Sequence, residues 1–107
     1  MAVTFTDQNF EKEAMEASKN KPVLVDFFAS WCGPCKLQGP IIDQLAEEMG
    51  DKAVIGKANV DEAIKISEQF SVMSVPTLIM FKDGKAVETF NGLQSKDALI
   101  VGIKKYL

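Results

Sequence analysis

The chain has 107 residues, 47% of them hydrophobic, and we expect one globular domain over residues 1–107. Twelve basic against fifteen acidic residues give a formal charge of -3 and no basic block, so we expect no nucleic-acid partner. Because the sequence has no histidine, carboxylates, thiols or lysines must carry proton transfer. We see neither a secretory signal nor an apolar run near the roughly 18 residues of a membrane span, so we expect a cytoplasmic protein without membrane contact.

Turn-forming residues divide the chain into short segments of alternating strand and helix periodicity. An apolar start at residues 3–5 leads into a helix that Thr6 or Asp7 can cap. The run VLVDFFA, residues 23–29, is apolar apart from Asp26, which is typical of a central strand covered on both faces. We therefore place this strand in the middle of a sheet.

The middle of the chain predicts a parallel strand pair joined by a helix. A helix is expected over residues 34–49, with Gly50 placed to end it. The segment AVIGKANV, residues 53–60, reads as the next strand, and its helical connection makes it parallel to the strand before. Asp61 can cap a short helix after this strand.

The last third predicts an antiparallel hairpin and a final helix. TLIMF and AVETF flank KDGK, residues 82–85, whose Asp-Gly pair is typical of a two-residue hairpin turn. Ser95 can cap a helix that carries Leu99, Ile103 and Leu107 on one face. The complete order alternates strand and helix three times and closes with two strands and a helix, which is an α/β arrangement.

Both cysteines of the chain, Cys32 and Cys35, lie in WCGPC, and three interpretations compete. Zinc takes four ligands, and without a second Cys or His pair only carboxylates or a second chain could complete its site, so we expect no metal. A structural cross-link would close a longer loop, because loop entropy gives about 2 kcal/mol here against about 4.7 for 100 residues. A redox dithiol is the interpretation that remains.

The setting of the cysteines favours the thiolate. They fall between a buried strand and a helix, so Cys32 lies at the positive end of the helix dipole, beside unpaired backbone donors. Lys36 adds a positive charge one turn along, and the thiolate is the form that attacks disulfides. Pro34 fits the first turn of the helix, and Cys35 then shares a helical face with Cys32.

These motifs resemble the thioredoxin family over essentially the whole chain. The similarity rests on WCGPC after VDFFA, Pro40 five residues beyond the second cysteine, VPT at the start of a strand, and KDGK followed by NG. The resemblance implies the thioredoxin fold, a central five-stranded mixed sheet in the order 1-3-2-4-5 flanked by four helices. It also implies a monomeric protein disulfide reductase without a cofactor, which thioredoxin reductase, an NADPH-dependent flavoprotein, re-reduces.

The resemblance implies distinct roles for the two cysteines and for a buried acid. Cys32 is the exposed nucleophile that attacks a substrate disulfide, and Cys35 is the shielded thiol that resolves the mixed disulfide. Asp26 lies behind Cys35 as its acid/base, with Lys57 on the neighbouring strand as modulator. The residues alone leave Asp26 open as a surface or lysine-paired acid, and Lys57 as an ordinary surface lysine. Gly33 before the proline resembles the reducing branch of the superfamily.

A docking surface for substrate is also implied by the resemblance. Trp31, which could otherwise fill the core, is placed on the rim of the site. The Val75-Pro76 bond is expected to be cis and to face the cysteines, so that the Val75 backbone pairs with an extended substrate segment. Gly92 gives this segment a flat surface, and Met73, at a position that is often basic in the family, borders it.

The sequence departs from the family at two further positions and leaves two rival functions. Gly39 replaces a common alanine, and Ser71 replaces a common glycine. One rival is a redox-independent binding or processivity subunit of another complex, which the fold alone would permit. The other rival is an exported disulfide oxidase or isomerase.

Overall fold

A five-stranded mixed sheet forms the centre of the computed structural model, which describes residues 2–107. The strands are β1 (Val3–Thr4), β2 (Val23–Phe28), β3 (Val54–Asn59), β4 (Thr77–Lys82) and β5 (Lys85–Asn91). Their spatial order is β1-β3-β2-β4-β5, in which β3 is parallel to β1 and β2, while β4 is antiparallel to β2 and β5. The predicted order and mixed character of the sheet are confirmed.

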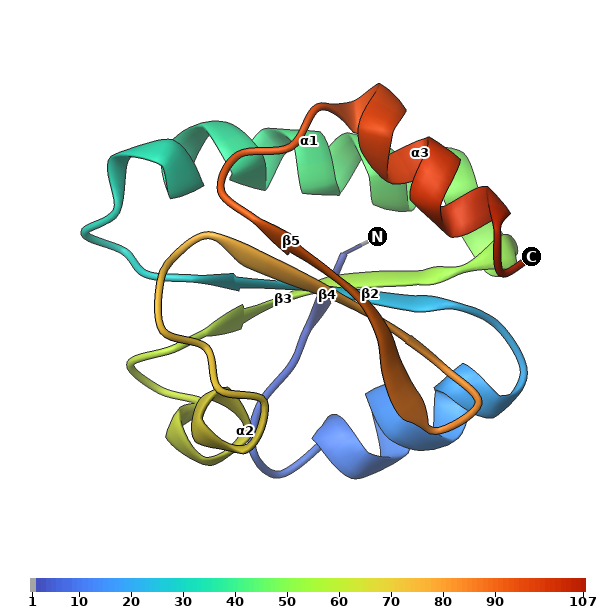
Figure 1. The fold of residues 1–107 in the computed structure, drawn as a ribbon, viewed down its shortest axis with the longest axis horizontal. Coiled ribbons are helices and arrows are strands. Elements are labelled where there is room, and N and C mark those ends of the chain that lie inside the picture. Colours follow the sequence, from blue (N-terminus) through green and yellow to red (C-terminus); the bar gives the residue numbers. More distant parts are fainter. Residues whose placement is uncertain (1) are drawn as a thin grey trace.

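Helices cover both faces of this sheet. They are η1 (Glu11–Glu16), η2 (Ala17–Lys19), α1 (Gly33–Met49), η3 (Gly50–Lys52), α2 (Ile64–Gln69) and α3 (Lys96–Lys104). The α1 and α3 helices lie on one face, and the continuous η1-η2 segment and α2 lie on the other (Figure 1). Across residues 2–107, every helix is too short or too polar to cross a membrane.

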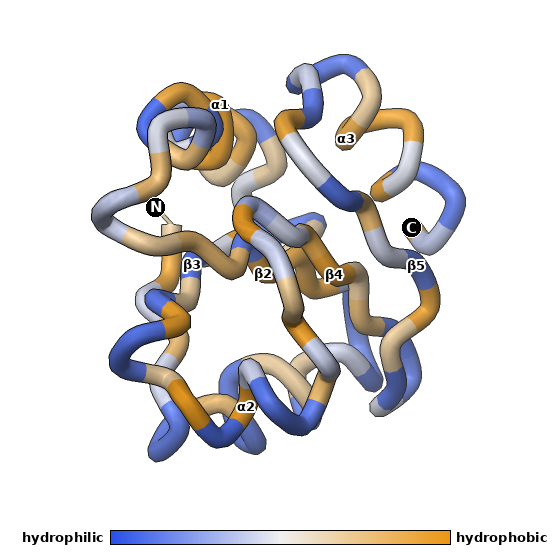
Figure 2. The backbone as a smooth tube through the Cα atoms, turned by 60° about the vertical axis from the view of Figure 1, so that its left-hand side comes forward, coloured by the Kyte–Doolittle hydropathy of each residue, from blue (hydrophilic) through white to orange (hydrophobic). Residues whose placement is uncertain are grey.

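Two hydrophobic cores lie on the two faces of β2, because successive side chains of a strand point to opposite sides. Val25 and Phe27 pack in the core under the η1-η2 segment, whereas Leu24 packs in the core under α1 and α3. The central strands are mostly in the hydrophobic colour in Figure 2, and the surrounding loops are largely hydrophilic. By the same alternation, Asp26 lies on the α1 side of the sheet.

The first helical segment is irregular, and the predicted cap residue Thr6 bonds in the turn before it, while Phe10 is the N-cap residue of η1 and gives no side-chain cap. The backbone N–H of Asn9 donates to Thr6 Oγ1 (3.1 Å), and the N–H of Thr6 donates to Asn9 Oδ1 (2.8 Å). The segment is a π-helix in η1 and a 3₁₀-helix in η2. At its end the buried Ser18 hydroxyl accepts from the Gly84 N–H (2.9 Å), which ties the helix to the hairpin turn.

The predicted cap of α2 by Asp61 is wrong. The carboxylate of Asp7 accepts from the backbone N–H groups of Lys65 (3.2 Å) and Ile66 (3.0 Å), so a residue far away in the sequence satisfies this helix start. The Asp61 side chain instead accepts a hydrogen bond from the Trp31 indole.

The predicted hairpin and the cap of the last helix are confirmed. Asp83 and Gly84 both have positive φ, at 57° and 78°, as a type I′ turn requires. Ser95 caps α3 by accepting from the Ala98 N–H (3.1 Å). The face predicted for α3 is wrong at its end, because the helix stops before Leu107 and that side chain is exposed.

Ser71, where a glycine is common in the thioredoxins that the sequence resembles, has a strained backbone conformation. Ser71 is exposed and has a φ of 55°, a left-handed conformation that costs a residue with a Cβ roughly 1–2 kcal/mol. We expect Ser71→Gly to raise the free energy of unfolding by about 0.5–1 kcal/mol, since part of the relief is lost to the greater freedom of glycine in the unfolded chain. Urea denaturation would measure this gain.

The matched control is Ser74→Gly, at a nearby exposed serine that has no positive φ. At position 74 glycine relieves no strain and only increases the freedom of the unfolded chain, so we expect the free energy of unfolding to fall by about 0.5–1 kcal/mol. Equal effects of the two substitutions would contradict the assigned strain.

Candidate active site around the paired cysteines

The cysteine pair lies at the junction of the central strand and the longest helix. Cys32 is the N-cap residue of α1, and Cys35 lies in the first turn of the helix, with the two Cα atoms 5.3 Å apart. The pair forms a disulfide. The backbone N–H of Cys35 points at Cys32 Sγ over 3.2 Å, so the sulfur takes the place of a capping oxygen. This is the electropositive helix start that the sequence predicts.

The expected difference in exposure between the two cysteines is absent from the disulfide. Cys32 keeps 5% of its surface exposed and Cys35 keeps 6%, because both pack against Ala29, with Val60 and Val75 beside them. The prediction of an exposed Cys32 and a shielded Cys35 is wrong for this oxidised form. Position still distinguishes them, since Cys32 precedes the helix and Cys35 lies within it.

Asp26 is enclosed on the side of the sheet that α1 covers. Only 1% of its surface is exposed, and neither carboxylate oxygen has a hydrogen-bond partner among residues 2–107. Burial raises the pKa of Asp26 from 3.8 to about 7, against a smaller lowering by the charge of Lys57. A cavity of about 200 Å³ borders both Asp26 and Cys35, so the acid and this cysteine line the same space.

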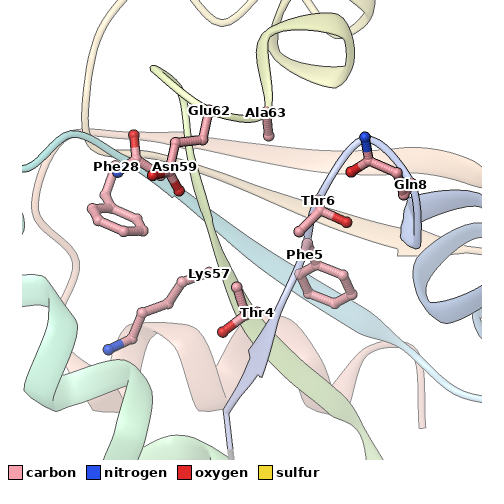
Figure 3. A pocket seen from close by; sticks show the side chains of 9 residues that line it. All are labelled: Thr4, Phe5, Thr6, Gln8, Phe28, Lys57, Asn59, Glu62 and Ala63. Atoms are coloured by element: carbon pink, nitrogen blue, oxygen red, sulfur yellow. The ribbon is translucent and has the colours of Figure 1, made fainter.

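Lys57 lies directly opposite Asp26 across β2 and β3, but its ion pair is with another acid. Its Nζ is 3.0 Å from Asp43 Oδ1 on α1. Figure 3 shows the side chain leaving β3 with its nitrogen toward the green helix, α1. Lys57 and Phe28 form a wall between the cavity at Asp26 and a second cavity of about 230 Å³ near β1.

An apolar rim lies along one side of the disulfide. Trp31 is 70% exposed, and its Nε1 donates to Asp61 Oδ2 (3.0 Å). The Val75-Pro76 bond is cis as expected, and the Val75 carbonyl oxygen is 3.7 Å from Cys32 Sγ. Met73 is 92% exposed, beside Trp31 and Val75 at a small cavity. The structure thus gathers these residues on one side of the cysteines.

The remaining candidate residues also lie around the site. Gly92 has a φ of 84°, and its N–H donates to the Pro76 carbonyl oxygen (2.9 Å), which places it beside the rim. Gly33 and Pro34 form the exposed first turn of α1. Lys36 lines the cavity that contains Asp26. No group of three or more His, Cys, Asp or Glu in residues 2–107 is arranged to hold a metal ion.

Sequence reasoning missed two acids that hold candidate residues in place. Asp43 lies seven residues after Lys36 and four after Gly39, so the three share one face of the helix. This spacing could have indicated that Asp43 faces Lys57. Asp61 carries no comparable signal, because its contact with Trp31 joins two loops that the sheet brings together.

The family model described as Thioredoxin matches residues 1–105 of the chain. The chain belongs to the thioredoxin family. It is 46% identical over 97 residues to the thioredoxin of Alicyclobacillus acidocaldarius subsp. acidocaldarius, covering 91% of this chain and 90% of the relative. It is also 46% identical over 105 residues to the thioredoxin of Bacillus subtilis, covering 98% and 97%. The thioredoxin of Rickettsia felis is 44% identical over 105 residues, covering 98% of each chain.

Membership of the thioredoxin family, together with the disulfide-forming pair, supports protein disulfide reductase function for this chain. Neither the redox-independent subunit nor the exported oxidase or isomerase is favoured by the relatives, each of which bears the name thioredoxin.

The raised pKa of Asp26 predicts how stability depends on pH. Between pH 3.8 and about 7 the folded state holds a proton that the unfolded chain has lost, so the free energy of unfolding falls as pH rises. The fall is complete above the folded pKa and amounts to about 4 kcal/mol. We expect Asp26→Asn to remove this fall, as measured by urea denaturation of the oxidised protein from pH 4 to pH 8.

Asp51→Asn is the control, since it removes an exposed acid in η3 and should keep the fall seen in the unmodified chain. A difference in stability between Asp26→Asn and the unmodified chain that stays constant with pH would contradict the assignment.

Proposed function

We propose that the reduced chain transfers two electrons to disulfides of other proteins through Cys32 and Cys35. In the first step the Cys32 thiolate attacks one sulfur of the substrate disulfide. A mixed disulfide forms, the substrate S–S bond breaks, and one substrate thiolate leaves. The start of α1 supports this role, because its positive end and the Cys35 N–H stabilise negative charge on Cys32 Sγ.

In the second step Cys35 resolves the mixed disulfide. Its thiol passes a proton to the Asp26 carboxylate and attacks Cys32 Sγ, which closes the internal disulfide and releases the second substrate thiolate. The cavity that borders both groups gives water and protons a route between them. A carboxyl with a pKa of about 7 is suited to exchange a proton near neutral pH.

Substrate is held, in this proposal, by the apolar rim and by backbone pairing. Trp31 and Met73 offer exposed apolar surface, and Val75 offers a carbonyl oxygen next to Cys32 Sγ. An extended segment that passes Gly92 meets no side chain there, since glycine has none. Lys36, Gly33 and Pro34 adjust the first turn of α1 and with it the reactivity of the cysteines.

We further propose that the protein works as a monomer in the cytoplasm without nucleic-acid partners. A dithiol that donates electrons must be kept reduced, which the cytoplasm does. Thioredoxin reductase, an NADPH-dependent flavoprotein, would return two electrons to the Cys32–Cys35 disulfide. The net charge of -3 argues against binding to a phosphate backbone.

The observation that carries the proposal is the disulfide at the start of α1 with a buried acid behind it. We expect Cys32→Ser and Cys35→Ser each to abolish insulin reduction, assayed with NADPH and thioredoxin reductase. Cys35→Ser should also accumulate a mixed disulfide with insulin, visible on a non-reducing gel, because its Cys32 can attack and nothing can resolve the product.

Inactivity of the unmodified chain in this assay would support a redox-independent binding subunit instead. Fluorescence of Trp31, the sole tryptophan, can also be titrated in a redox buffer. A strongly oxidising potential would support the exported oxidase, whereas the reductase requires a reducing one.

A further inference from the structure

The Lys57 ammonium group lies between two acids and pairs with one of them. Its Nζ is 3.0 Å from Oδ1 of Asp43, an exposed residue of α1. The other acid, Asp26, is registered opposite Lys57 in the sheet, yet no basic group in residues 2–107 forms an ion pair or hydrogen bond with its carboxylate. Figure 3 shows the Lys57 side chain extended toward α1.

Few other charges face Asp26. From α1 the cavity is lined by Lys36 and by Cys35, which is held in the disulfide, and from β3 by Lys57. From β4 the residue registered opposite Asp26 is Leu78, which has no charge. Of the two lysines, only Lys57 is held by an ion pair, so the position of its charge depends on that partner.

The cavity leaves room for the ammonium group to lie elsewhere. Gly39 lines it beside Lys57, and even a methyl group on Gly39 would be 3.6 Å from Nζ, which is ordinary van der Waals contact. The space on the Asp26 side is the cavity of about 200 Å³ that Lys57 and Asp26 both line. The ion pair with Asp43 therefore determines which acid lies next to the Lys57 ammonium group.

We infer that Asp43 is a positioning residue of this site, whose ion pair with Lys57 holds the ammonium group away from the Asp26 carboxyl. The inference rests on the proposed role of Asp26 as proton carrier for Cys35. Without the Asp43 charge, Lys57 is left unpaired beside the cavity that Asp26 also lines, and an ammonium group that turns toward Asp26 favours the ionised carboxylate. Asp43 thus keeps Asp26 able to hold its proton near neutral pH.

The pair contributes little to stability, since Asp43 is 59% exposed in its side chain and surface ion pairs are screened by water. The effect of the Lys57–Asp43 pair is instead to fix the position of the Lys57 ammonium group. The test must therefore follow the titration of Asp26 itself, in a variant whose folding is close to that of the unmodified chain.

The experiment is a carbon-13 NMR titration of the aspartate carboxyl groups in the oxidised protein, with Asp26→Asn used to assign the signal. In Asp43→Asn we expect the pKa of Asp26 to fall by about one unit, the smaller end of the effect of an opposite charge at ion-pair distance. The control is Glu48→Gln, on α1 like Asp43, which breaks the ion pair of Glu48 with Lys96 of α3 (2.7 Å) and should leave the pKa of Asp26 unchanged.

A second comparison separates the position of Lys57 from the direct field of Asp43. In a Lys57→Met background, Asp43→Asn should shift the Asp26 pKa by less than a third of its effect in the unmodified chain. An equal shift in both backgrounds would overturn the inference, as would an unchanged pKa in Asp43→Asn with Lys57 present. Urea midpoints close to the unmodified chain establish that the variants fold.

Turnover distinguishes this inference from the proposed function. If both hold, the acid limb of the pH profile for insulin reduction moves to lower pH in Asp43→Asn and stays in place in Glu48→Gln. A shifted Asp26 pKa with an unmoved profile would overturn the proton-carrier role and support the positioning role. An unshifted Asp26 pKa in Asp43→Asn, in a chain that reduces insulin normally, would overturn the positioning role of Asp43 and support the proposed function.

Discussion

The carboxyl group of Asp26 lies in a covered central strand with no hydrogen-bond partner among residues 2–107, and the chemistry proposed for the site depends on that burial. Burial removes most of the stabilisation that water gives to its charge, and the opposite charge of Lys57 offsets only part of that loss, so the protonated form persists to near neutral pH. Because its pKa is about 7, both forms are present near neutral pH, so the ionised form can take a proton from a thiol and the protonated form can return one. The same burial destabilises the fold above that pH.

The two hydrophobic cores make this arrangement tolerable. β2 is buried on both faces: Val25 and Phe27 pack in the core under the η1-η2 segment, and Leu24 packs in the core under α1 and α3. Their burial offsets the cost of enclosing one ionisable group. The end of β2 then delivers the chain to α1, where the start of the helix receives Cys32 and faces its sulfur with a backbone N–H. Acid and sulfur are thus placed by one strand and the helix that follows it.

Local patterns predicted the elements well, and long-range contacts were the ones missed. The apolar run of β2, the Asp83-Gly84 turn and the Ser95 cap each carry their signal within a few residues. The cap of α2 does not, because Asp7 and Ile66 meet only once the sheet has formed. The same holds for Lys57, whose choice of Asp43 over Asp26 depends on where α1 crosses β3.

The exposure of the cysteines was missed for a different reason. The family resemblance implies unequal exposure for Cys32 and Cys35. In the disulfide both are buried, and both pack against Ala29 and Val75. The order of the two along the chain was readable from the sequence. Their accessibility was not, since it depends on side chains contributed by separate loops.

The cap that Asp7 provides joins the beginning of the chain to a helix of only six residues. A helix this short is not stable by itself in water. The N–H groups of its first turn donate to Asp7, which precedes β2 in the chain. The loop that leaves this helix carries Met73 and Val75 to the cysteines. Loss of Asp7 with the amino-terminal segment would therefore loosen the loop that carries Met73 and Val75, the surface proposed to bind substrate.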